Sequence, residues 1–181
     1  MTNKQAIALV GLSGAGKSSV GRRLAECLGY PLVDTDTLIM HSAGRTIPEI
    51  FAAEGEARFR ELEADALSAA LNGAPSIVAT GAGIVLRPEN RARLRERALV
   101  AWLDAPTETL VGRLLAHDEA RPLLQGADPA ARLETLRQAR HALYAEVADV
   151  RIVTDGRSVA EIAAAILGMF ELTIHNAEQI G

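Results

Sequence analysis

The sequence has almost no cysteine, no long apolar run and no excess of basic charge. Its one cysteine, Cys27, excludes a disulfide within the chain, as is typical of a reducing cytosol. No apolar stretch is long enough to cross a bilayer, and the N-terminal segment MTNKQAIALVG lacks the pattern of a secretory signal. The net charge of −4 gives no reason to expect nucleic acid or membrane as a partner. We therefore expect a cytoplasmic globular protein.

Several conspicuous side chains have ordinary interpretations. The histidines lack the spacing of a metal site. Arginines at every second position over 91–97 spread around a helix that also carries Glu89 and Glu96, so we interpret them as a solvated surface. Cys27 falls on the apolar side of a predicted helix and Trp102 within a predicted strand, so we expect both in the core.

Short apolar runs alternate with helical patterns along the chain. We expect strands over 6–10, 31–34, 76–80, 98–104 and 150–153. We expect helices over 17–28, 37–44, from Pro48 to about 54, 56–71, 88–97, from Pro106 to about 117, 130–147, and around the apolar stripe 159–170. This order predicts an α/β fold of three layers, with a five-stranded parallel sheet between helices and ligands at the carboxyl ends of its strands.

The pattern predicts one domain over residues 1–172. Residues 117–129, HDEARPLLQGADP, combine charges, glycine and proline without a period and predict a mobile loop or lid. We interpret residues 173–181 as a disordered tail or the start of a linker to another domain, although LTIH at 172–175 alternates like the start of a strand.

A phosphate-binding loop is the most specific motif. GLSGAGKS at 11–18 matches G-x-x-x-x-G-K-[ST] fully, between a predicted strand and a predicted helix. Its glycines let backbone N–H groups surround phosphate, Lys17 can reach the β- and γ-phosphates, and the Ser18 hydroxyl can ligate Mg²⁺. The sequence shows no N-K-x-D motif typical of GTPases. The candidate nucleotide-binding residues here are Gly11, Ser13, Gly14, Ala15, Gly16, Lys17, Ser18 and Ser19.

Two aspartates follow the second predicted strand. Asp34 and Asp36 point the same way while the chain stays extended. One can orient the Mg²⁺ shell and the other can accept a proton from a substrate hydroxyl. Alternatively, they form an Asx turn or a helix cap, with Asp36 capping the helix at 37. The spacing alone leaves both interpretations open.

Further motifs contribute arginines and a second glycine turn. GEARFRELE at 55–63 places Arg60 and Glu63 on one helical face, with Arg58 as a competitor; by default either arginine is a solvated charge. TGAG at 80–83 is a glycine turn after a strand. Arg121 lies in the predicted lid, and RHALY places Arg140 and Tyr144 one helical turn apart.

These six motifs, GLSGAGKSS, DTD, GEARFRELE, TGAG, RPLL and RHALY, resemble in order and interval those of the shikimate kinase family, from about residue 6 to 168. The resemblance implies ATP-dependent, Mg²⁺-assisted phosphorylation of the shikimate 3-hydroxyl. It implies catalytic roles for Lys17, Asp36 and Arg121, Mg²⁺ ligation by Ser18 and Asp34, and nucleotide contacts from Arg121 and Arg157. It assigns to shikimate Asp36, Arg60, Glu63 (through Arg60), Gly81, Ala82, Gly83 and Arg140.

Two positions depart from the family pattern. The family turn usually has three glycines, but here Ala82 is the middle residue; if that position needs a positive φ, alanine is strained by about 1 kcal/mol. Ala142 stands where the family usually has proline. Related small-molecule kinases, such as a gluconate kinase, and a ligand-sensing domain without turnover remain the alternatives. We expect a monomer, possibly fused to another enzyme of the pathway.

Overall fold

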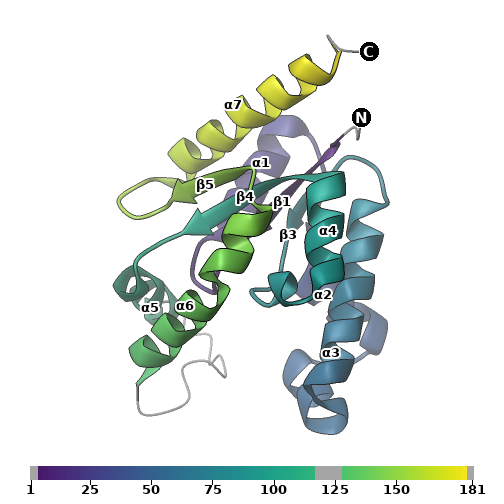
Figure 1. The fold of residues 1–181 in the computed structure, drawn as a ribbon, viewed down its shortest axis with the longest axis vertical. Coiled ribbons are helices and arrows are strands. Elements are labelled where there is room, and N and C mark those ends of the chain that lie inside the picture. Colours follow the sequence, from purple (N-terminus) through teal and green to yellow (C-terminus); the bar gives the residue numbers. More distant parts are fainter. Residues whose placement is uncertain (1–3, 117–127, 179–181) are drawn as a thin grey trace.

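The computed structural model describes residues 4–116 and 128–178. Its centre is a parallel sheet in the order β2-β3-β1-β4-β5 (Figure 1). The strands are β1 (Ala6–Val10), β2 (Leu32–Asp34), β3 (Ile77–Ala79), β4 (Ala98–Asp104) and β5 (Val150–Val153). The predicted five-stranded α/β architecture is thus confirmed.

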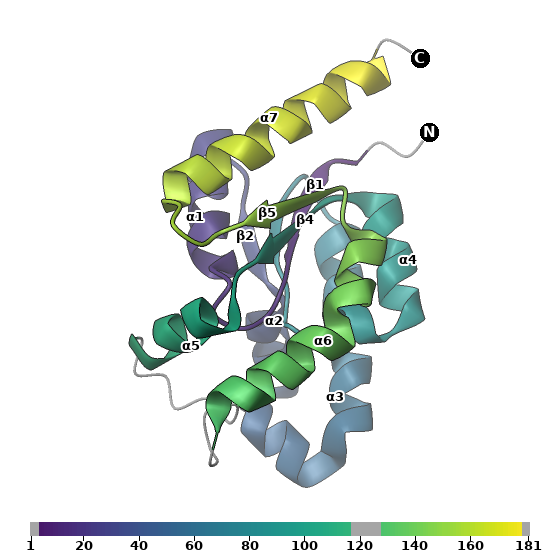
Figure 2. The same cartoon turned by 60° about the vertical axis from the view of Figure 1, so that its left-hand side comes forward.

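Helices cover both faces of this sheet. They are α1 (Lys17–Leu28), α2 (Thr35–Ala43), α3 (Ile47–Leu71), α4 (Pro88–Arg97), α5 (Thr107–Ala116), α6 (Pro129–Val147) and α7 (Val159–Glu178), with a short 3₁₀ turn, η1 (Ile84–Leu86). Helices α1 and α7 pack together on one face, whereas α4 and α6 pack against β4 on the other (Figure 2). The result is the three-layer arrangement expected of parallel strands with helical crossovers.

The core explains why the strand runs are apolar throughout. Every residue of β1 and β4 is buried, because both strands lie inside the sheet and are covered on both faces. Trp102 in β4 is 3 % exposed, which confirms its predicted place in the core. A second, smaller apolar cluster joins α2 to α3 through Ile39, Ile50, Phe59 and Ala66.

Helix α3 is two helical segments joined at Gly55. That residue has φ 79° and ψ 178°, which interrupts the helix at the point where the sequence predicted one helix to end and another to begin. The first segment starts at a capping box, in which the Glu49 carboxylate accepts from the Thr46 backbone N–H at 2.8 Å. The second segment carries Arg60 and Glu63, and α3 packs against α2 and α4.

The expectations about Cys27 and about the end of the last helix were wrong. Cys27 is exposed, because the buried face of α1 passes through Val20, Gly21 and Leu24 and leaves position 27 to the side. The last helix does not stop near 170: α7 continues to Glu178, so residues 173–178 are helical rather than a tail. Most of the predicted lid, including Arg121, lies outside the described residues.

Two kinds of structure are absent from the described residues. Within the described ranges, no helix has the length and apolarity required to cross a membrane. The same residues contain no cluster of three or more His, Cys, Asp or Glu side chains suited to a metal ion.

The arginines of α4 are largely paired; Arg91, for example, binds Glu146 of α6 at 2.8 Å.

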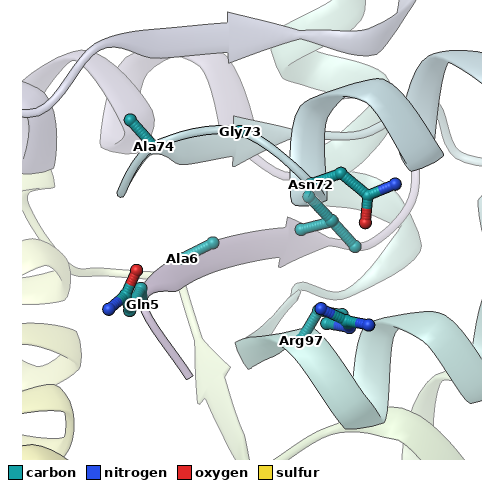
Figure 3. A pocket seen from close by; sticks show the side chains of 7 residues that line it. Gln5, Ala6, Asn72, Gly73, Ala74 and Arg97 are labelled. Carbon is teal, nitrogen blue, oxygen red and sulfur yellow. The ribbon is translucent and has the colours of Figure 1, made fainter. Parts of the chain in front are cut away.

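A pocket of about 330 Å³ opens at the amino ends of the strands (Figure 3). It lies beside the start of β1 and the end of α3, and its polar lining includes Gln5, Asn72 and Arg97. No residue that the sequence analysis assigned to ligand binding lines it. The candidate site lies instead at the opposite, carboxyl ends of the strands.

Candidate active site

The phosphate loop connects β1 to α1 and is shaped by its glycines. Gly11, Gly14 and Gly16 have φ of 141°, 82° and 95°, values that favour glycine. A Cβ on Gly11 would lie 2.3 Å from the Leu103 carbonyl oxygen, so the loop also needs glycine there for space. The Lys17 ammonium donates to the carbonyl oxygens of Gly11 and Leu12 at 2.8 and 2.9 Å, which folds its side chain back over the loop.

The start of α1 faces the open side of this loop. Ser18 is exposed in the first helical turn, and Ser13, Gly14 and Ser19 are half-buried around it. Ala15 is buried, and its N–H donates to the Leu12 carbonyl at 3.2 Å. The positive end of α1 and the backbone N–H groups of its first turn therefore meet at this surface, an arrangement that attracts phosphate.

Asp34, not Asp36, is the helix cap. Asp34 is the last residue of β2, and its Oδ1 accepts from the N–H groups of Asp36 and Thr37 at 3.0 and 3.1 Å. The helix therefore starts at Thr35, two residues earlier than the sequence predicted, and the interpretation of Asp36 as the cap was wrong. Asp36 lies in the first turn of α2, with its side chain directed at the glycine turn.

Residues 81–83 form the centre of a converging group of charged side chains. The Gly81 N–H donates to the Thr35 hydroxyl at 3.0 Å, which ties the turn to the start of α2. A Cβ on Gly81 would lie 2.7 Å from Asp36 Oδ1 and 3.0 Å from Glu63 Oε1. The two carboxylates, from α2 and α3, thus approach the same glycine from different elements.

Arg60 packs directly on this turn. A Cβ on Gly83 would lie only 2.0 Å from Arg60 Nη1, so glycine is required for the guanidinium to occupy this place. Arg60 pairs with Glu63 at 2.9 Å and with Glu56 at 3.0 Å, and its side chain is 17 % exposed. Arg58, by contrast, is 45 % exposed and pairs with surface carboxylates. The structure therefore separates the two arginines that the spacing alone left in competition.

Arg140 reaches the turn from the opposite side. Its Nη1 donates to the Ala82 carbonyl oxygen at 3.0 Å, and the Tyr144 hydroxyl donates to the same oxygen at 2.6 Å. Asp36, Arg60, Glu63 and Arg140 are thus gathered around residues 81–83, although they come from α2, α3 and α6.

The electrostatics of this group are dominated by the buried Glu63. Burial raises the pKa of Glu63, and the nearby Asp36 raises it further, while Arg60 and Arg140 partly offset these effects. Burial also opposes the charge of Arg60, but Glu63 and Glu56 outweigh it and hold the pKa of Arg60 above its usual value. In the part of the chain that the structure describes, Glu63 Oε1 has no hydrogen-bond partner, so one buried acceptor faces the turn.

A contact on the nucleotide side was missed by the sequence analysis. Arg113 of α5 donates to the Gly14 carbonyl at 3.4 Å and to the hydroxyl and carbonyl oxygens of Thr154 at 2.9 and 3.0 Å. It links the phosphate loop to the end of β5. An arginine late in an amphipathic helix gives no signal of such a contact. Arg157, predicted near the adenine, is exposed in the loop after β5, and its Nη2 donates to the Glu161 carbonyl at 3.4 Å.

Comparisons with known proteins agree with this geometry. The family model for shikimate kinase matches residues 13–171. A shikimate kinase from Symbiobacterium thermophilum is 52 % identical over 162 residues, covering 89 % of this chain and 93 % of the relative. A solved shikimate kinase from Acinetobacter baumannii, in complex with shikimate, is 38 % identical with a TM-score of 0.88, over 95 % of this chain and 96 % of that one.

A gluconokinase from Sinorhizobium meliloti shares the fold at 21 % identity and a TM-score of 0.62, over 98 % of both chains. At that identity the likeness concerns architecture alone. The family model spans most of the chain, and the relative from Symbiobacterium thermophilum and the solved structure from Acinetobacter baumannii are both shikimate kinases. The chain belongs to the shikimate kinase family.

Proposed function

We propose that this chain transfers the γ-phosphoryl group of ATP to the 3-hydroxyl of shikimate. The observation that carries the proposal is the approach of Arg60 and Arg140 to one glycine turn, with Asp36 beside it. Strand β3, which leads into this turn, lies next to β1, which leads into the phosphate loop. An acceptor held at the turn would therefore be adjacent to a nucleotide held at the loop.

Shikimate has one carboxylate and three hydroxyls. Guanidinium groups bind carboxylates through paired N–H donors, so Arg60 and Arg140 supply suitable partners for its acid group. Asp36 can accept hydrogen bonds from neighbouring hydroxyls and take the proton of the attacking oxygen. Glu63 holds Arg60, and the lack of side chains at Gly81 and Gly83 leaves room for the charged groups around the ring.

The nucleotide side uses Gly11, Ser13, Gly14, Ala15, Gly16, Lys17, Ser18 and Ser19. Lys17 contacts backbone oxygens of the loop, and we propose that it turns to the phosphates when they bind. Ser18 and Asp34 would hold Mg²⁺, which neutralises phosphate charge when bound. Both capping bonds of Asp34 go to Oδ1, so among the described residues Oδ2 stays available to a cation. Arg121 and Arg157 remain predictions for the lid and the adenine.

The decisive experiment measures ADP release from ATP with and without shikimate, with gluconate as the competing acceptor. We expect turnover with shikimate alone.

Arg60→Ala and Arg140→Ala should raise the KM for shikimate by at least about tenfold, because each removes a charge-assisted interaction. Asp36→Asn should remove most turnover while shikimate still binds. Unchanged shikimate saturation in both arginine variants, or ADP release only with gluconate, would refute the proposal, and shikimate binding without turnover would indicate a sensor.

The assignment of a small-molecule acceptor carries further expectations. We propose that the protein acts as a cytoplasmic monomer, and light scattering after size-exclusion chromatography tests the oligomeric state. The lid over 117–129 and a fusion to another enzyme of the pathway remain predictions.

A further inference from the structure

Tyr144 is a buried tyrosine to which the proposed reaction assigns no role. It lies in α6, one helical turn after Arg140, and is 1 % exposed. Its hydroxyl donates to the Ala82 carbonyl oxygen at 2.6 Å, so it reaches across from α6 to the turn that holds the candidate acceptor site. A buried tyrosine hydroxyl needs a hydrogen-bond partner, and here that partner belongs to the turn of the candidate site.

The Ala82 oxygen has two donors. Arg140 Nη1 lies 3.0 Å from the same atom, and a carbonyl oxygen has two lone pairs to share between them. Arg140 is therefore held at the turn through one of the five N–H groups of its guanidinium. It can keep this bond while other N–H groups bind a substrate carboxylate.

The ring of Tyr144 is held in place by its neighbours. It stacks on Trp102 of β4, with centroids 5.7 Å apart and an interplanar angle of 23°. Trp102 is itself 3 % exposed and carries the Arg151 guanidinium 4.7 Å above its ring. Burial raises the pKa of Tyr144, so its hydroxyl stays protonated and remains a donor throughout the physiological range. The hydroxyl therefore has a fixed place and a fixed direction of donation.

We propose that Tyr144 is a positioning residue that fixes the Ala82 carbonyl oxygen and, through it, the Arg140 guanidinium that binds the substrate carboxylate. Without the Tyr144 hydroxyl, the half-buried carbonyl loses one of its two donors and is held less firmly. The Arg140 guanidinium that is anchored on it is then placed less accurately for the carboxylate. The proposal rests on the proposed function, since it concerns binding of shikimate by Arg140. It also gives the half-buried Ala82 a defined task, which its backbone oxygen performs.

The test is Tyr144→Phe, which removes the hydroxyl and keeps the ring stacked on Trp102. We expect the Kd for shikimate, by calorimetry, and its KM to rise about five- to tenfold, as for loss of one hydrogen bond. The KM for ATP and kcat should change by less than about twofold, because the nucleotide side is untouched. Tyr30→Phe is the matched control: Tyr30 lies edge-on to Phe170, away from the site, and its variant should bind shikimate like the wild type. Emission from Trp102, the one tryptophan of the chain, verifies that the stack is retained.

A double-mutant cycle separates coupling from general damage. In an Arg140→Ala background, adding Tyr144→Phe should change the KM for shikimate by less than about twofold, because the guanidinium that the hydroxyl assists is gone. Equal shikimate Kd values for wild type and Tyr144→Phe, or fully additive effects in the cycle, overturn this inference alone. A wild-type protein that neither binds nor phosphorylates shikimate overturns the proposed function and this inference with it.

Discussion

At the residue scale, the turn at 81–83 shows why two of its positions need glycine while the middle one can be alanine. Gly83 has φ −90° and ψ −2°, and Gly81 also lies outside the left-handed region, so neither is required for its backbone conformation. Both are required for space, since a Cβ would meet Asp36 or Arg60. The sequence analysis looked for strain at Ala82, whereas the structural constraint acts on its two neighbours.

Gly83→Ala should therefore disturb acceptor binding more than folding. The added methyl would collide with the Arg60 guanidinium, the far end of a flexible side chain that can move at modest cost. We expect the KM for shikimate to rise by about tenfold or more, as for loss of a charge-assisted contact. The control is Gly73→Ala, where the nearest atom to a new Cβ is 3.8 Å away. Steady-state kinetics of both variants check this, and equal KM values would show that Arg60 does not bind the acceptor.

Glu63 gives the stability a distinctive pH dependence. Burial raises the pKa of Glu63 above its usual value, so between the unfolded and the folded pKa the folded chain holds a proton that the unfolded chain has lost. Stability contributed by that proton is present below the unfolded pKa and is lost as the pH rises through the folded pKa. Relative to Glu63→Gln, the wild type should become progressively less stable as the pH rises above about 4.5.

Urea unfolding of the wild type and Glu63→Gln at several pH values measures this difference. Glu61→Gln, which removes an exposed carboxylate from the same helix, is the control and should give a flatter difference. A difference between wild type and Glu63→Gln that stays constant from pH 4.5 to neutrality would contradict the raised pKa.

Residue spacing predicted which side chains matter better than it predicted their roles. It placed the aspartates at a strand end, but it left Arg58 in competition with Arg60 and left open whether Asp36 caps a helix. The resemblance to the family, not the spacing, assigned Arg60, Glu63 and Arg140 to the site. The choice between neighbours depends on how a helix is rotated against the sheet. That rotation is set by packing partners from distant parts of the chain, which no local pattern contains.

At the element scale, the ends of helices were predicted accurately where a glycine or proline marks them and inaccurately where neither is present. Pro88 begins α4, Gly29 caps α1, and Gly55 divides α3, each as the sequence predicted. The end of α7 was predicted too early because an apolar stripe ends at Phe170. No glycine or proline follows between Met169 and Glu178, so nothing in the sequence stops the helix there.

Gly55→Ala and Gly168→Ala should have opposite effects on stability. Gly55 has φ 79° and ψ 178°, a region open almost only to glycine, so alanine should destabilise the protein by about 1–3 kcal/mol. Gly168 lies within α7 without a positive φ, and alanine there should stabilise by about 0.5–1 kcal/mol. A new Cβ meets nothing within 4 Å at either position, so backbone conformation alone decides the sign. Denaturant unfolding compares them, and a stabilised Gly55→Ala would show that the kink is absent in solution.

At the scale of the whole molecule, the strand order brings the proposed parts of the site together. The carboxyl ends of β2, β3 and β1 are successive neighbours, and they lead to the aspartates, the glycine turn and the phosphate loop. On the other side, β4 and β5 lead to α5 with Arg113 and to Thr154. The sequence predicted that ligands meet at this edge. It did not predict the order of the strands, because that order depends on crossovers between segments far apart in the chain.

This arrangement predicts that shikimate stabilises the entire fold, independently of turnover. A ligand at about 100 times its Kd adds about 2.7 kcal/mol of stability, which raises the Tm of a protein of this size by about 5–10 °C. Gluconate at the same concentration should give no comparable shift. In Arg60→Ala the shift with shikimate should shrink, because the weaker Kd leaves the same concentration far from saturation. Differential scanning calorimetry without nucleotide measures all three. The two acids are distinguished by how well their carboxylates reach Arg60 and Arg140. Equal Tm shifts with shikimate and gluconate would therefore show that these two arginines do not select the acceptor.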